Sequence, residues 1–221
     1  MRLQILVCLS LAWLVTCTAS AEAPPRDADR VAVVRNENSP VSRAVAGDYA
    51  QRRGIQQVVS VRCPDSAANP GLETITFAIF QAALEKPLRD FLASHPNIDF
   101  IVLTKGIPLR IADAPGLGLG DHRPSLDSYL AALDYGKVPD AVRVHLSDSG
   151  FTGTAWANRF WNSRERFAHA KFGGYLVTRL DAYTVADAKA LTTRSLAAEQ
   201  QAGFMSRAMV LEAALSNRSL A

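Results

Sequence analysis

The chain has 221 residues, and 48% of them are hydrophobic, which is sufficient for a folded core and too high for a disordered protein. Its length fits one α/β domain with additional segments. The formal net charge of only +3 argues against a nucleic-acid-binding or anionic-membrane surface. Beyond the first residues, no apolar run reaches the length that a membrane span needs.

The first 21 residues have the pattern of an export signal. Arg2 precedes the apolar run 3–15, and the small residues 19–21 follow it. This run is too short for a transmembrane helix, so we expect cleavage after residue 21 and a periplasmic or extracellular protein. Acylation at Cys17, as in a lipoprotein, is less favoured because Thr16 stands directly before the cysteine.

Cleavage would change both the cysteine count and the charge. Cys8 and Cys17 would be removed, so Cys63 alone would remain and no internal disulfide could form. Of the 24 basic residues only Arg2 would be lost, which leaves 23 against 21 acidic residues. The mature chain would therefore be nearly neutral.

The first half of the remaining chain has a β-α-β pattern. Ser39 as N-cap, Pro40 at the first helical position and Gly54 as C-cap predict one helix. Short apolar runs rich in β-branched residues predict the strands. The expected order is a polar leader at 22–30, a strand at 31–34, this helix, and a second strand at 58–61.

A loop at 65–71 leads into a longer helical pattern. Apolar residues at helical spacing predict a helix from about Thr74 to Ala93, which Pro87 must kink or restart at Lys86. The run 100–103 then predicts a third strand, buried on both faces. This alternation predicts a parallel sheet.

The pattern weakens between about 112 and 174, which we interpret as an insertion. A short helix is expected from 125 to 133, and the aromatic-rich part, 151–172, is expected to pack over the sheet as a satellite core. The glycine-rich segment 116–120 is predicted to be a plain loop, because it neither follows a strand directly nor opens a helix as a dinucleotide fingerprint does.

Regular structure returns at a fourth strand, 175–178. Thr184 and Asp187 form a capping-box pattern that begins a helix running to about Glu199. The α/β domain therefore spans about 31–204, and 205–221 form a tail. We predict a three-layer, doubly wound α/β fold, flavodoxin-like or caspase-like, with a mostly parallel sheet and helices on both faces.

Four motifs carry a resemblance to a known family, and they are VVRNENS at 33–39, LTKGIPLR at 103–110, SLDS at 125–128 and YLVTRLD at 175–181. The chain resembles an uncharacterised exported bacterial family that occurs in species carrying the exosortase protein-sorting system. The match covers about 31–202. It implies an accessory or binding module in envelope or extracellular-matrix biology, without a known reaction.

A more distant similarity joins the segment 179–199 to gingipain-type cysteine peptidases, which have a caspase-like sheet. In those enzymes the catalytic histidine and cysteine follow on later strands, and the tail 205–221 does not resemble the family. This similarity implies a truncated, inactive peptidase relative as the alternative function. Missing strands would leave an exposed sheet edge through which the protein could self-associate.

The candidate residues gather where strands end. Cys63 is the one possible thiol nucleophile, but none of the four histidines follows a predicted strand. The acidic and histidine residues 121, 122 and 148 lack metal-ligand spacing, so we expect neither metal nor cofactor.

The free N–H groups at the start of the first helix, with nearby basic residues, favour an anionic or peptide ligand. The candidate ligand-binding residues are Asn36, Asn38, Ser39, Lys105, Arg110, Asp127, Arg179 and Asp181. The alternative is that they only hold the loops together, with Arg179 paired to Asp127 or Asp181.

Overall fold

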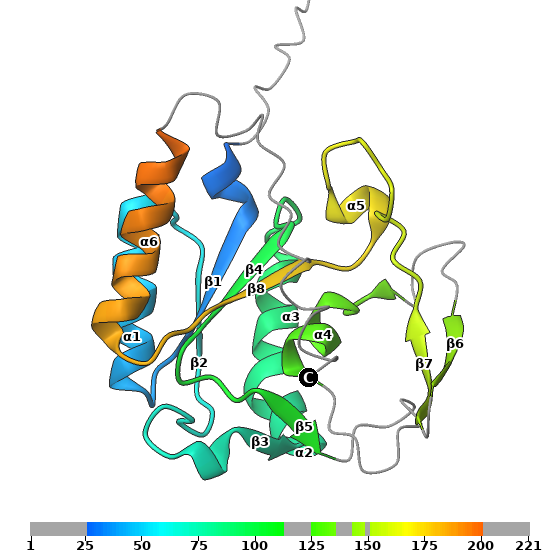
Figure 1. Ribbon diagram of the computed structural model, residues 1–221, viewed down its shortest axis with the longest axis horizontal. Helices are drawn as coiled ribbons and strands as arrows, with labels where there is room; N and C mark the ends of the chain where they lie inside the picture. The colour runs from blue at the N-terminus through cyan, green and yellow to red at the C-terminus, as the bar shows by residue number, and fades with distance from the viewer. Residues whose placement is uncertain (1–25, 113–124, 136–142, 149–150, 201–221) are drawn as a thin grey trace, which may run out of the picture.

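The protein folds around a four-stranded parallel sheet (Figure 1). The computed structural model describes residues 26–112, 125–135, 143–148 and 151–200, so the predicted signal, the glycine-rich loop and the tail lie outside the described residues. The sheet order is β2-β1-β4-β8. These strands are β1 (Val31–Asn36), β2 (Val58–Val61), β4 (Phe100–Thr104) and β8 (Leu176–Leu180). The predicted α/β class with a parallel sheet is confirmed.

Alternating side chains of the central strands supply the two cores. Ala32 and Val34 of β1 lie in one cluster, whereas Val33 lies in the other. β4 repeats the pattern, since Ile101 and Leu103 join the first cluster and Val102 the second. Because successive side chains of a strand point to opposite faces, this sheet is buried on both sides, as the continuous apolar runs predict.

Helices α1 (Pro40–Arg53) and α6 (Val185–Glu199) lie together on one face of the sheet (Figure 1). The predicted caps are present. Ser39 accepts the N–H of Ser42, Gly54 has the left-handed conformation with φ of 65°, and Thr184 and Asp187 form a reciprocal capping box. Each cap satisfies backbone groups that a helix end leaves free, which is why both helices begin where the sequence indicates.

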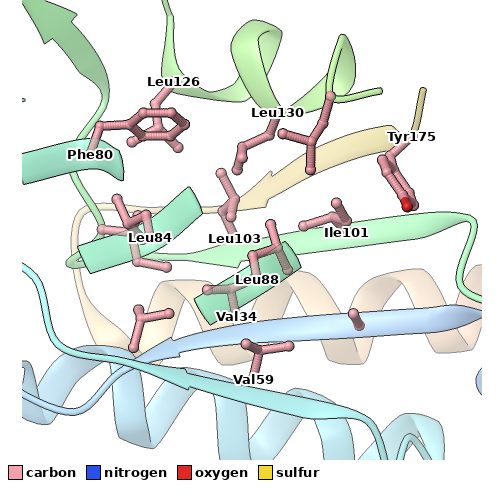
Figure 2. Close-up of a cluster of buried hydrophobic side chains, with 14 of the residues drawn as sticks. Val34, Val59, Phe80, Leu84, Leu88, Ile101, Leu103, Leu126, Leu130 and Tyr175 are labelled. Carbon is pink, nitrogen blue, oxygen red and sulfur yellow. The ribbon is translucent and has the colours of Figure 1, made fainter. Parts of the chain in front are cut away.

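The other face carries α2 (Phe77–Phe80), η3 (Gln81–Glu85), α3 (Lys86–Ala93) and α4 (Leu126–Ala131). Figure 2 shows their apolar side chains packed against the sheet. Phe80, Leu84, Leu88 and Leu130 are buried there. The predicted helical stretch from about Thr74 is wrong at its start, because Thr74–Thr76 form a strand. The restart that Pro87 predicts at Lys86 is confirmed, since α3 begins there after the π-helical η3.

Two small sheets accompany the main one. Strand β3 (Thr74–Thr76) pairs in parallel with β5 (Arg110–Ala112), and β6 (Arg143–Asp148) forms an antiparallel hairpin with β7 (Phe151–Trp156). Thr76 also caps α2 by accepting the N–H of Ile79. The β-branched residues 74–76 therefore form a strand whose last residue is the N-cap of the following helix. The remaining short elements are η1 (Asp27–Arg30), η2 (Pro70–Leu72) and α5 (His169–Phe172).

A buried ion pair fixes the amino end of the sheet. Arg30 Nε donates to Asp99 Oδ2 at 2.6 Å, and the guanidinium also donates to the carbonyl oxygen of Phe167. Asp99 Oδ1 in turn accepts the backbone N–H of His169 at 2.5 Å. These contacts hold the segment before β8 against the strands.

The aromatic residues of this segment form the predicted satellite core only in part. Phe160, Phe167 and Phe172 have ring centroids 5.1–5.9 Å apart, and Phe167 also approaches Phe100. Trp161, which the sequence predicts in the same cluster, is 80% exposed and lies outside the core. The side chain of Trp156 lies outside the described residues.

Candidate functional site

Asn36, at the end of β1, joins the ends of three chain segments. Its fully buried side-chain amide donates to the carbonyl oxygens of Cys63 and Pro64 after β2, at 3.2 and 3.3 Å, and to that of Gly106 after β4, at 2.9 Å. Its Oδ1 accepts the N–H groups of Cys63 and Asn38. Because buried polar groups are costly without partners, this residue primarily organises the loops.

The turn after β4 closes tightly against the start of α1. Gly106 has φ of 93°, and a Cβ at this position would lie 2.4 Å from Ser39 Oγ. Gly106 and Ser39 lie at the carboxyl end of the sheet between β1 and β4. At this point the chain changes from adding a strand on one side of β1, which is β2, to adding strands on the other side, which are β4 and β8. In open α/β sheets that switch point is the usual place for a ligand. Here the protein's own backbone and Ser39 fill it.

Two hydroxyl groups that the sequence reading did not single out complete this closed region. Ser42 Oγ lies 2.7 Å from Thr104 Oγ1, and it accepts the backbone N–H of Asn36 at 2.8 Å. Thr104 Oγ1 donates to the carbonyl oxygen of Val34 at 2.9 Å. The signal for Ser42 is its position three residues after the N-cap, whereas Thr104 ends an apolar strand and has no sequence signature.

Lys105 and Asp181 form the more open part of the edge. Lys105 Nζ lies 3.0 Å from Asp181 Oδ1, and the two side chains are 23% and 37% exposed. The backbone N–H of Lys105 donates to the carbonyl oxygen of Leu180 at 3.0 Å, so the ends of β4 and β8 hold the pair in place. Asp181 Oδ1 also accepts the N–H of Ala182 at 2.8 Å.

Arg179 holds α4 and the segment after β4 against β8. Its guanidinium makes a two-pronged contact with the carboxylate of Asp127, with Nε–Oδ2 at 3.1 Å and Nη2–Oδ1 at 2.5 Å. The same side chain donates to the carbonyl oxygens of Ile107 and Pro108 at 2.8 and 3.0 Å. The sequence allows either Asp127 or Asp181 as the partner of Arg179, and in the structure the partner is Asp127. All the described hydrogen bonds of this guanidinium go to other groups of the protein, so they stabilise the fold.

The remaining candidates take different places. Asn38 is exposed and donates to the carbonyl oxygen of Cys63 at 3.0 Å, so it lies at the same edge. Arg110 belongs to β5, and its half-exposed guanidinium pairs with Glu73 at 3.4 Å. Among the described residues, Arg110 therefore has none of the other candidates as its ion-pair partner.

Cys63 is buried at the carboxyl edge, and burial raises the pKa of its thiol to about 12. A nucleophilic cysteine needs a lowered pKa and a nearby base. Both histidines whose side chains are described, His95 and His169, lie toward the opposite edge, since His95 precedes β4 and the N–H of His169 contacts Asp99 before β4. The described residues therefore give a Cys63 nucleophile no support.

The described residues contain no group of three or more acidic, histidine or cysteine side chains placed to hold a metal ion. None of the described helices has both the length and the apolar character of a membrane span.

Comparison with family models, curated proteins and solved structures gives no match. The geometry of the carboxyl edge is therefore the basis for assigning a function.

Proposed function

We propose that this protein is an exported binding or accessory module and that the Lys105–Asp181 pair binds the charged end of a peptide. The observation that supports it is a difference in exposure along the carboxyl edge of the sheet. Asn36, Ser39 and Gly106 pack tightly together there, whereas the side chains of Lys105 and Asp181 beside them are partly exposed. A rigid support behind two accessible charges is the arrangement that a small binding site requires.

The two side chains retain hydrogen-bonding capacity for a ligand. An ammonium group has three N–H donors, and the described contact with Asp181 uses one of those of Lys105. Both described hydrogen bonds of Asp181 fall on Oδ1, which leaves Oδ2 as an acceptor. A ligand carboxylate would therefore bind to Lys105 through charge-assisted hydrogen bonds, and a ligand amine would bind to Asp181.

This chemistry fits the context that the family resemblance implies. An exported protein in the envelope or matrix meets peptide segments that carry free termini and acidic side chains. Binding at Lys105 needs no metal, cofactor or nucleophile. The proposal also accounts for a fold in which the buried Cys63 and the paired Arg179 serve the structure of the edge.

The test is a two-dimensional ¹H–¹⁵N NMR titration of the full chain with tetra-alanine. We expect shifts in the amide signals of Lys105, Gly106, Asp181 and Ala182, with no change at Ala197 on α6. Tetra-alanine that is acetylated at its amino end and amidated at its carboxyl end should lose most of these shifts, since it lacks both charged groups that Lys105 and Asp181 would bind. Equal shifts with both peptides, or shifts confined to other regions, would contradict the proposal.

A further inference from the structure

The outer edge of β8 has no strand beside it among the described residues, because β8 ends the order β2-β1-β4-β8. Its burial differs accordingly. Ile101, Val102 and Leu103 of the neighbouring β4 are at most 3% exposed, whereas every residue of β8 is only partly buried or exposed, and Thr178 is exposed. Uncovered strand edges are templates for pairing with another chain.

Two backbone hydrogen bonds at the ends of β8 determine which of its backbone groups point outward. The N–H of Leu176 donates to the carbonyl oxygen of Asp99, and the carbonyl oxygen of Leu180 accepts the N–H of Lys105, both at 3.0 Å. In a parallel ladder alternate residues bond to the same neighbour, so Leu176, Thr178 and Leu180 bond to β4. The N–H and C=O groups of Val177 and Arg179 therefore face the open side.

This pattern is complementary to itself. If a second β8 lies antiparallel beside the first, with a two-fold axis at Thr178, Val177 of each copy lies opposite Arg179 of the other. Each such pair exchanges both N–H···O=C bonds, and Thr178 faces Thr178 of the second copy as a non-hydrogen-bonded pair. An isologous contact of this kind closes after two copies.

The side chains permit the same register. A threonine pair directly across two antiparallel strands is favourable. Arg179 would lie opposite Val177, so no like charges face each other, and its guanidinium is already held by Asp127 within its own copy. Thr178 is exposed and projects from the face opposite to Arg179, so α4 does not cover it.

We propose that β8 is the interface for a second copy of this chain, with the two β8 strands antiparallel about Thr178 and one sheet continuing through both copies. This inference is independent of the proposed peptide site. It assigns a register to the self-association that an open sheet edge suggests, and the register can be tested residue by residue.

The first test is cysteine crosslinking in the full chain carrying Cys8→Ser and Cys17→Ser. Non-hydrogen-bonded pairs place their Cα atoms about 4.5 Å apart, within the roughly 4.4–6.8 Å range that a disulfide spans. Under mild oxidation Thr178→Cys should convert to a disulfide-linked dimer. Ala197→Cys, exposed on α6, is the matched control and should stay unlinked. A Thr178→Cys protein that stays unlinked would overturn the proposal.

The second test uses charge and needs no covalent bond. Thr178→Lys places two ammonium groups opposite each other and should give a monomer in sedimentation analysis, as Thr178→Glu should for two carboxylates. Mixing the two variants should restore a dimer, because opposite charges then face each other. Circular dichroism melting checks that each variant folds. Monomers that stay apart on mixing, or single variants that still dimerise, would contradict the antiparallel register.

Discussion

The side-chain amide of Asn36 donates a 2.9 Å hydrogen bond to the carbonyl oxygen of Gly106, which joins the end of β1 to the turn after β4. Asn36 also bonds the backbone after β2. One buried side chain thus positions three strand ends, and the open Lys105–Asp181 pair lies directly beside this junction.

Replacing Asn36 with alanine should lower the free energy of unfolding by about 2–4 kcal/mol, because several buried backbone groups lose their partners. Urea denaturation of the full chain measures this change. Asn38→Ala is the matched control, since Asn38 is exposed and its side chain makes one described hydrogen bond. The control should cost less than about 1 kcal/mol, and equal costs for the two variants would contradict the role assigned to Asn36.

Gly106→Ala should destabilise the protein by about 1–3 kcal/mol or more from backbone strain alone. Its φ of 93° disfavours any side chain, and the new Cβ would meet Ser39 Oγ at 2.4 Å. Gly47→Ala in α1 is the comparison, because a Cβ there meets nothing within 4 Å. That change should stabilise the helix by roughly 0.5–1 kcal/mol. Thermal melting should show shifts of opposite sign, and a neutral Gly106→Ala would contradict the tight closure.

Asp99→Ala should cost about 3–5 kcal/mol, since it removes the buried carboxylate that pairs with the guanidinium of Arg30 and leaves only the exposed Asp27, at 3.4 Å, as a charged partner. The same change at Asp90 removes an exposed pair with Lys86 and should alter stability by about 0.5 kcal/mol or less. Chemical denaturation compares the two. A small effect at Asp99 would mean that the amino end of the sheet tolerates loss of this ion pair.

Stability should decline as the pH rises from about 9 toward 12. Burial raises the pKa of the Cys63 thiol from 9.0 to about 12 and that of the Tyr175 hydroxyl from 10.0 to about 12. The unfolded chain therefore releases these protons first, so the folded state binds more protons in this window and loses stability as pH increases. Urea midpoints measured from pH 8 to 11 should fall, and less steeply in Cys63→Ala. A pH-independent midpoint would contradict the raised pKa values.

The sequence predicted the elements that have strong local signals. Strands β1, β2, β4 and β8 are short apolar runs, and α1 and α6 begin at the predicted caps. Strands β3 and β5 have three residues each, and they are strands because they pair with one another although they lie far apart in the sequence. Propensity over so few residues is too weak to identify them.

The candidate site was predictable as an edge but not as a set of contacts. Asn36, Lys105 and Asp181 lie together because parallel strands end at the same side of a sheet. Their hydrogen-bond partners depend on the strand order and on loops that approach through space, which no local pattern encodes. Arg110 illustrates this limit, since its proximity in sequence to Lys105 does not bring its guanidinium to the same partners.

The central claim is that Lys105 binds a peptide carboxylate, and calorimetric titration of tetra-alanine into matched variants tests it most directly. Lys105→Met should weaken binding at least about tenfold, because hydrogen bonds to charged groups contribute about 1.5–3 kcal/mol. Lys189→Met, which removes an equally charged side chain on α6, should leave the affinity unchanged. Equal affinities of the wild-type and Lys105→Met proteins would contradict the account.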